Sequence, residues 1–151
     1  MRKLTWLCVA VLAVALPAGA ARAGETAQDP QAIADECVNR ATELADTCVE
    51  ANEDAADACV ERIEQLLAEG KTALARRVGR QCVKHITRRS DVCAHRIRQL
   101  CRHCTRVLLR LGEPELAREV RAACGEQLEK VRASQREATQ RIRDALGGIA
   151  E

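Results

Sequence analysis

Apolar residues along most of this chain return to the same helical face every eleven positions. Cys37, Cys48 and Cys59 each begin an eleven-residue unit, and a leucine or alanine follows seven positions after each cysteine. Eleven residues complete three helical turns at about 3.67 residues per turn, so the repeated positions form one straight stripe. The later segments keep helical spacing as well, and no stretch alternates as a strand would. The pattern predicts an all-α protein.

Proline, glycine and aspartate mark where the helices begin and end. Asp29-Pro30 is typical of a helix start, because Asp accepts hydrogen bonds from free N–H groups and Pro fits the first turn. Gly70 is typical of a C-terminal cap, and Glu113-Pro114 starts a further helix. Residues 24–28 are predicted to be a flexible tail before a single domain over 29–151. The expected helices cover about 30–69, 72–111 and 114–146.

The cysteine positions predict how these helices pair. The two sets of eleven-spaced cysteines are mirror images about Gly70-Lys71, and another pair is symmetric about Gly112-Glu113. Antiparallel helices about 8–10 Å apart bring facing Cα atoms within the roughly 4.4–6.8 Å that a disulfide requires. A parallel pairing with a constant offset of 45 residues also matches the spacing, but within one chain it would require residues 60–81 to run back along the bundle. Between two chains, a symmetric dimer linked by like cysteines remains open. Within one chain we predict the disulfides Cys59–Cys82, Cys48–Cys93, Cys37–Cys104 and Cys101–Cys124.

Cys101 and Cys104 indicate a third neighbour for the middle helix. Three residues separate them, which is about 60° around a helix axis. The two neighbours of any helix in a triangular bundle also lie about 60° apart, so one cysteine can face each neighbour. We therefore predict an antiparallel three-helix bundle, in which a long helical hairpin and a third helix are joined by disulfides.

The first 23 residues have the pattern of a secretory signal peptide. Arg2 and Lys3 precede an apolar run from Leu7 to Leu16, which is too short to span a bilayer, and Ala21-Arg22-Ala23 is a cleavage site. Cleavage near Ala23 predicts an exported protein, periplasmic or secreted, without a transmembrane segment in the mature chain. Eight cysteines remain, an even number that favours disulfides in an exported chain. No aromatic residue and no methionine remain.

Charge is divided between the expected helices. Residues 24–69 contain 13 acidic and 2 basic side chains, whereas residues 71–110 contain 12 basic side chains and one acidic one. We expect many of these charges to pair across the two helices, as flanking charges do in coiled coils. A candidate face for an anionic partner, either a protein or an envelope surface, consists of Arg76, Arg77, Arg80, Lys84, Arg88 and Arg89. Nucleic acid is not expected as a partner, because the mature chain has no aromatic side chain to stack on bases.

Motifs for catalysis or cofactor binding are not recognisable. In Cys101-Arg102-His103-Cys104, a threonine stands where haem attachment requires histidine, and the pair lies mid-helix rather than at the helix N-terminus that lowers a thiol pKa. We predict neither enzymatic activity nor a cofactor. As thiolates, the inward cysteines would resemble those of bacterial copper-storage proteins, which bind copper(I) through rows of soft ligands. Here each level of the bundle offers only two sulfurs.

The helical hairpin also resembles the twin Cys-x9-Cys proteins, whose two helices are joined by two disulfides. The spacing here is Cys-x10-Cys and is repeated three deep, so the resemblance implies the architecture alone. We expect an exported, disulfide-stabilised structural or interaction protein without catalytic activity. Two alternatives stay open. One is a thiol-rich copper(I)- or zinc-binding storage or resistance protein, and the other is a charged module that binds the envelope or a partner through its Arg-rich helix.

Overall fold

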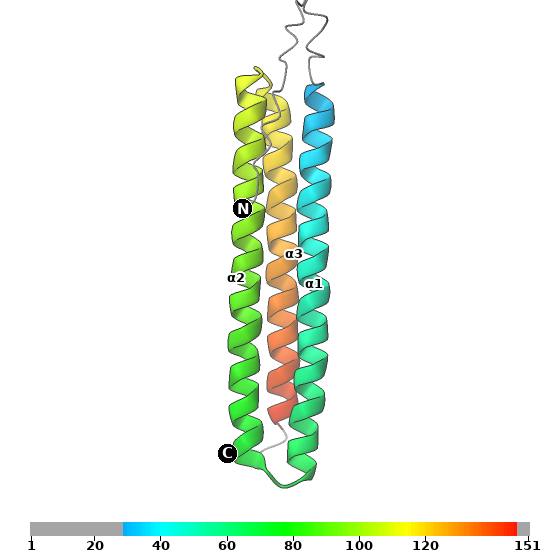
Figure 1. The fold of residues 1–151 in the computed structure, drawn as a ribbon, viewed down its shortest axis with the longest axis vertical. Helices are drawn as coiled ribbons and strands as arrows, with labels where there is room; N and C mark the ends of the chain where they lie inside the picture. Colours follow the sequence, from blue (N-terminus) through cyan, green and yellow to red (C-terminus); the bar gives the residue numbers. More distant parts are fainter. Residues whose placement is uncertain (1–28, 148–151) are drawn as a thin grey trace, which may run out of the picture.

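The computed structural model describes residues 29–147, which form three long helices packed side by side as an elongated bundle (Figure 1). Helix α1 spans Pro30–Ala68, α2 spans Thr72–Arg110 and α3 spans Pro114–Gly147. The chain turns back twice, so α1 and α3 run parallel to each other and antiparallel to α2. Every pair of helices is in contact. The predicted signal peptide and tail, over 1–28, lie outside the described residues.

The helix ends follow the local signals in the sequence. The Asp29 carboxylate accepts a hydrogen bond from the backbone N–H of Gln31, at 3.0 Å, and Pro30 occupies the first turn. Gly70 and Gly112 adopt φ angles of +71° and +83°, the left-handed conformation that glycine reaches without a Cβ clash. Each glycine therefore ends a helix and lets the chain reverse. The N-terminal ends of the three helices match the expected positions, and each C-terminal end differs by a single residue.

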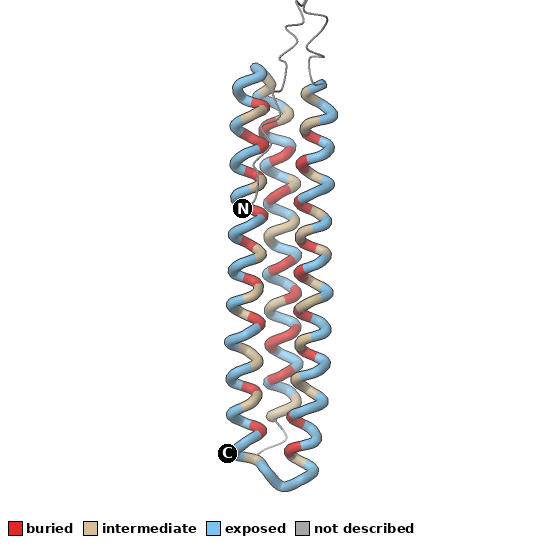
Figure 2. Tube along the Cα trace, in the orientation of Figure 1, coloured by how far each residue is buried: buried red, intermediate tan, exposed pale blue. Residues whose placement is uncertain are grey.

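The core consists of one buried stripe from each helix (Figure 2). Most of these side chains are small, because alanine and cysteine supply much of the stripe on α1. The buried apolar residues divide into two clusters. The first core cluster, at the end where α2 meets α3, includes Ile97, Leu108 and Val120. The second core cluster, towards the α1–α2 turn, includes Ile63, Ile86 and Ile142.

A buried polar layer separates the two core clusters. Asn52 of α1, Ser90 of α2 and Ser134 of α3 meet at this level and are all buried. The Asn52 Nδ2 group donates to Ser90 Oγ at 3.0 Å and to Ser134 Oγ at 3.4 Å, and Ser90 Oγ donates to Asn52 Oδ1 at 3.4 Å. Each helix contributes one member, so the hydrogen bonds form only when the three helices are in register. Such layers favour one alignment over others in helical bundles.

Four disulfides crosslink the bundle and join the pairs expected from the sequence. Cys37–Cys104, Cys48–Cys93 and Cys59–Cys82 connect α1 to α2, and Cys101–Cys124 connects α2 to α3. The paired Cα atoms are 6.2–6.3 Å apart, within the usual range for disulfides. Cys101 and Cys104 thus face different neighbours, as their angular separation predicts. The all-α, disulfide-crosslinked three-helix bundle is confirmed.

Candidate functional site

The candidate basic face is divided by the structure. Five of its six members are exposed on α2, whereas Arg89 is half-buried. The Arg89 guanidinium donates to the backbone carbonyl of Ala51 on α1, at 2.6 Å. Arg89 precedes the inward-facing Ser90 and lies on the side of α2 next to α1, so its side chain crosses to that helix. It therefore differs from Arg76, Arg77 and the other exposed members of the predicted face.

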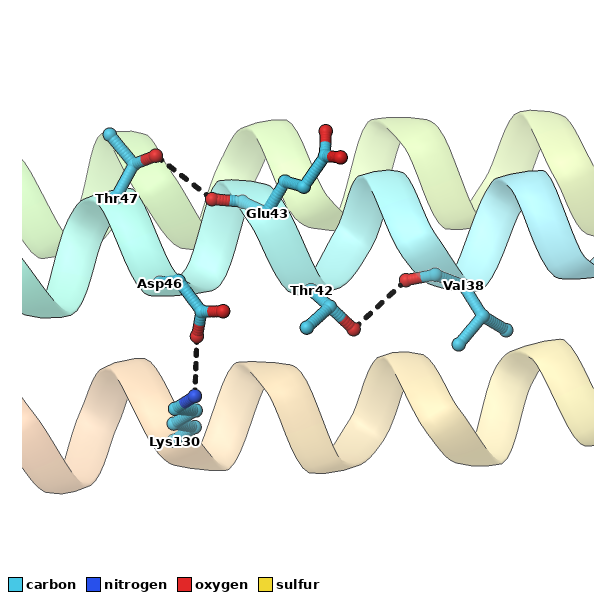
Figure 3. A network of polar contacts seen from close by, with 6 residues as sticks. All are labelled: Val38, Thr42, Glu43, Asp46, Thr47 and Lys130. Atoms are coloured by element: carbon cyan, nitrogen blue, oxygen red, sulfur yellow. Dashed lines mark hydrogen bonds and ion pairs between the residues drawn. The ribbon is translucent and has the colours of Figure 1, made fainter.

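Interhelical ion pairs join α1 to α3. Lys130 pairs with Asp46, and Arg141 pairs with Asp57, eleven residues further along both helices. Figure 3 shows the first of these pairs, with Lys130 reaching from α3 to Asp46 on α1. No ion pair crosses between α1 and α2 within residues 29–147. The expectation that the acidic and basic helices would neutralise each other is therefore wrong for this interface.

The lack of ion pairs between α1 and α2 follows from the residues that flank the disulfides on α1. Three positions beyond each α2-facing cysteine, about 60° around the axis, the sequence places Arg40, Ala51 and Arg62. These are the outer positions of the side that faces α2, and none of them carries a carboxylate. Arg40 pairs with Glu36, and Arg62 donates to the side-chain carbonyl of Gln65, so both stay on their own helix. Asp46 lies on the opposite side of α1, next to α3, whereas Glu36 and Glu43 lie beside Leu100 of α2 but form no ion pair with that helix.

The basic residues of α2 are therefore not neutralised by carboxylates of α1. Of the 12 basic residues in 71–110, only Lys71 forms an ion pair with a described residue; its partner is Glu69, at 2.7 Å. The hydrogen bond from Lys71 is the main cause that lowers the pKa of the Glu69 carboxyl group, and the charges of Lys71 and Arg62 act in the same direction. This pair lies at the α1–α2 turn, so it leaves the surface of α2 positively charged along its length.

A second row of arginines on α2 was missed by the sequence reasoning. Arg98, Arg102 and Arg106 are exposed and lie 22 residues after Arg76, Arg80 and Lys84. Two eleven-residue repeats return a helix position to the same face, so the two rows share one side of α2. The same eleven-residue repeat that relates the cysteines also relates these polar positions, so the sequence carries a signal for this row.

Side chains that could hold a metal ion are dispersed in the part of the chain that the structure describes. All eight cysteines of residues 29–147 form disulfides. His85, His95 and His103 are exposed on α2. No group of three or more His, Cys, Asp or Glu side chains lies close enough together in this region to hold a metal ion.

Comparisons of the chain with protein-family models, with curated protein sequences and with solved structures give no match. None of the helices within 29–147 combines the length and the apolar character required to cross a membrane. The arrangement of charge on the bundle is therefore the main guide to function.

Proposed function

We propose that this protein is an exported, non-catalytic interaction module that binds an acidic protein surface through the basic side of α2. The observation that carries the proposal is the lack of ion pairs on α2: of its exposed arginines, none is paired with a carboxylate of residues 29–147. Arginine suits this role, because its planar guanidinium donates two parallel hydrogen bonds to one carboxylate.

The crosslinked hairpin supports this proposal by holding the binding surface rigid. Three disulfides fasten α2 to α1 along the bundle. Arginines on a fixed helix lose less freedom on binding than the same residues on a flexible segment, and this raises affinity for a partner of matching charge pattern. Disulfides are also typical of exported proteins, which agrees with the predicted signal peptide.

A protein partner is favoured over a lipid surface by the composition of the exposed side chains. Helices that lie in the membrane interface insert Trp, Phe or Leu side chains beneath the headgroups. Residues 29–147 contain no aromatic residue, and only four large apolar side chains are exposed there: Leu74, Val92, Leu109 and Leu111. An anionic membrane would therefore attract this surface through charge alone.

The proposal can be tested with the oxidised protein and fluorescein-labelled poly-L-glutamate as a model acidic polypeptide. Fluorescence anisotropy should show binding that weakens as the salt concentration rises, because exposed charges are screened. The variant Arg76→Glu/Arg77→Glu/Arg80→Glu should bind at least about tenfold more weakly, a loss of roughly 1.4 kcal/mol. Vesicles of phosphatidylglycerol and phosphatidylcholine provide the competing surface.

A matched control is available on α3. Arg118 already pairs with Glu115, and Arg132 and Arg136 already pair with Glu129. Reversing these three arginines to glutamate changes the net charge by the same amount but removes paired cations, so we expect less than about a threefold loss of binding. Equal losses in both variants would mean that only total charge matters. That result, or stronger binding to vesicles than to poly-L-glutamate, would contradict the proposal.

The state of the exported protein should be determined on the same preparation. Purification without reductant, alkylation under denaturing conditions and intact-mass analysis should give a chain that begins at Gly24 and carries no alkylated cysteine. Eight alkylated cysteines with bound copper or zinc would instead identify a metal-handling protein.

A further inference from the structure

A groove of about 1120 Å³ lies between α2 and α3, near the end of the bundle where these helices are joined. Four arginines line the groove: Arg98, Arg102 and Arg106 of α2, and Arg121 of α3. No carboxylate lines the groove, and none of the four arginines forms an ion pair with a residue in 29–147. The groove is therefore bordered by positive charge that its surroundings do not neutralise.

Two acidic residues of α3 directly follow groove residues along the chain, Glu126 after Gly125 and Glu129 after Leu128. Neither forms an ion pair with a groove arginine, and the charge of Glu129 is already engaged. Its carboxylate forms ion pairs with Arg136, at 2.7 Å, and with Arg132. The hydrogen bond from Arg136 is the largest cause that lowers the pKa of Glu129, followed by the charge of Arg136. Because these partners lie on α3 itself, Glu129 does not neutralise the groove arginines. Among these, Arg106 donates through Nε to the backbone carbonyl of Arg102 on its own helix, at 3.2 Å.

Apart from the polar side chains of Gln99 and Thr105, the remainder of the groove is apolar. The Cys101–Cys124 disulfide lies between the two helices, and Leu109 and Leu128 line the groove beside it. Gly125 leaves space above the disulfide, since a Cβ atom at this position would meet nothing within 4 Å. An occupant can therefore place an apolar side chain between the rows of charge.

We propose that this groove binds an acidic amphipathic helix of a partner protein. Arg98, Arg102 and Arg106 are spaced four residues apart, which is about 6 Å along the axis of α2. Carboxylates at every fourth position of a second helix repeat at the same distance and can each meet one guanidinium. A leucine-sized side chain on the same face would then contact Leu109 and Leu128. This inference rests on the proposed function and identifies where, and in what form, the acidic partner binds.

A second copy of this chain fits the groove less well. Helix α1 is the acidic element of the protein, but none of the four exposed large apolar side chains of residues 29–147 belongs to it. It would supply carboxylates but no large apolar side chain to contact Leu109 and Leu128. A single anionic amphiphile, such as a fatty acid, would cover the apolar part of the groove but would bind only some of its arginines. Both occupants are separate outcomes of the experiment below.

The probe is a fluorescein-labelled synthetic 18-residue helical peptide with glutamates at every fourth position beside a leucine stripe. Binding to the oxidised protein is measured by fluorescence anisotropy. The groove variant Arg98→Glu/Arg102→Glu/Arg106→Glu should lose at least about tenfold in affinity. The matched α3 variant Arg118→Glu/Arg132→Glu/Arg136→Glu makes the same charge change outside the groove lining and should lose less than about threefold, because these cations are already paired with Glu115 and Glu129.

A neutral substitution separates the groove from general charge attraction. Gly125→Leu should fill the space beside the disulfide and lower the affinity for the helical peptide at least about fivefold. Binding of poly-L-glutamate should stay unchanged. Circular dichroism should show the same helical content for each variant. Equal losses of affinity in the two triple variants, or no effect of Gly125→Leu, would overturn the proposal that the groove binds the helix. Either result would leave the proposed function standing. No binding of either probe to the unmodified protein would overturn both.

Two further results would also overturn the inference by identifying another occupant. Light scattering that shows concentration-dependent self-association, abolished in the groove variant, would assign the groove to a second copy of the chain. Saturable binding of oleate below its micelle concentration, without binding of the peptide, would assign it to an anionic amphiphile.

Discussion

The α1–α2 and α1–α3 interfaces hold the same helix in different ways. Three disulfides and no ion pair connect α1 to α2, whereas two ion pairs and no disulfide connect α1 to α3 in the described residues. Both sets of contacts recur at eleven-residue intervals. The repeat thus places covalent links on one side of α1 and ion-pairing carboxylates on the other, and the basic charge of α2 is left without an ion pair to α1.

The position of its only disulfide also divides α3 into a crosslinked part and a part without crosslinks. Cys124 gives α3 its single crosslink, and every described residue after it is held by packing, hydrogen bonds and ion pairs. Ile142 belongs to this second part and packs in the second core cluster, together with Ile63 of α1. Local stability should therefore fall towards the C-terminal end of α3, because few constraints oppose its separation from the hairpin.

Truncation of a fully buried isoleucine should have the largest effect. Ile142→Ala should lower the free energy of unfolding by about 3 kcal/mol, through lost apolar contact and the cavity that remains. Ile63→Ala, equally buried in the same cluster but close to the Cys59–Cys82 crosslink, is the matched control. Denaturant unfolding should give similar losses for both, while hydrogen exchange should accelerate at the end of α3 only in Ile142→Ala. Identical exchange patterns would show that the two regions unfold as one unit.

Removal of the α2–α3 crosslink should produce the next largest effect. Cys101→Ser/Cys124→Ser opens a 23-residue separation and should cost up to about 3 kcal/mol in the chain-entropy model. Hydrogen exchange should increase throughout α3, because α3 then has no covalent tie to the hairpin except the turn.

The corresponding control is Cys48→Ser/Cys93→Ser, which removes the middle crosslink of the hairpin and leaves those at Cys37–Cys104 and Cys59–Cys82. Protection of α3 should be nearly unchanged in that variant. Equal deprotection of α3 in both double variants would contradict the division between a crosslinked hairpin and a more weakly held third helix.

The buried polar layer should contribute an intermediate amount. Asn52→Ala removes the amide that hydrogen-bonds to both Ser90 and Ser134, so two buried hydroxyl groups lose a partner at a cost of about 1–3 kcal/mol. The triple variant Asn52→Ala/Ser90→Ala/Ser134→Ala should recover part of this loss, because it leaves no unpaired hydroxyl group. Chemical denaturation of the oxidised proteins measures both values. A triple variant that is less stable than Asn52→Ala would show that the layer acts through packing.

The smallest effect should come from the ion pairs between α1 and α3. Asp57→Asn removes the partner of Arg141, and both side chains are partly exposed, so the loss should stay below about 1 kcal/mol and decrease at high salt. Asp46→Asn should behave in the same way for Lys130. A larger loss, independent of salt, would mean that charge rather than packing holds α3 in place.

Much of the fold could be predicted from the sequence because its signals are local or strictly periodic. Asp29, Gly70 and Gly112 specify the ends of helices through short-range backbone requirements. The eleven-residue repeat places all the cysteines of a set on one face of a helix. The mirror-symmetric positions and helix geometry together then specify the antiparallel pairing. The candidate site was only partly predicted: the basic helix was recognised, but Arg89 was assigned to the open face and the groove arginines were not singled out.

The sequence by itself determined the helical repeat, the helix ends, the cysteine pairs and the division of charge between α1 and α2, since these depend on residue type and helical period. Only the tertiary structure decided which charges neutralise one another. An ion pair depends on the outer positions of two packed helices, and there α1 offers Arg40, Ala51 and Arg62 to α2 but Asp46 and Asp57 to α3. The tertiary structure also decided that Asn52, Ser90 and Ser134 meet, because three helices must be in register before their side chains share one layer.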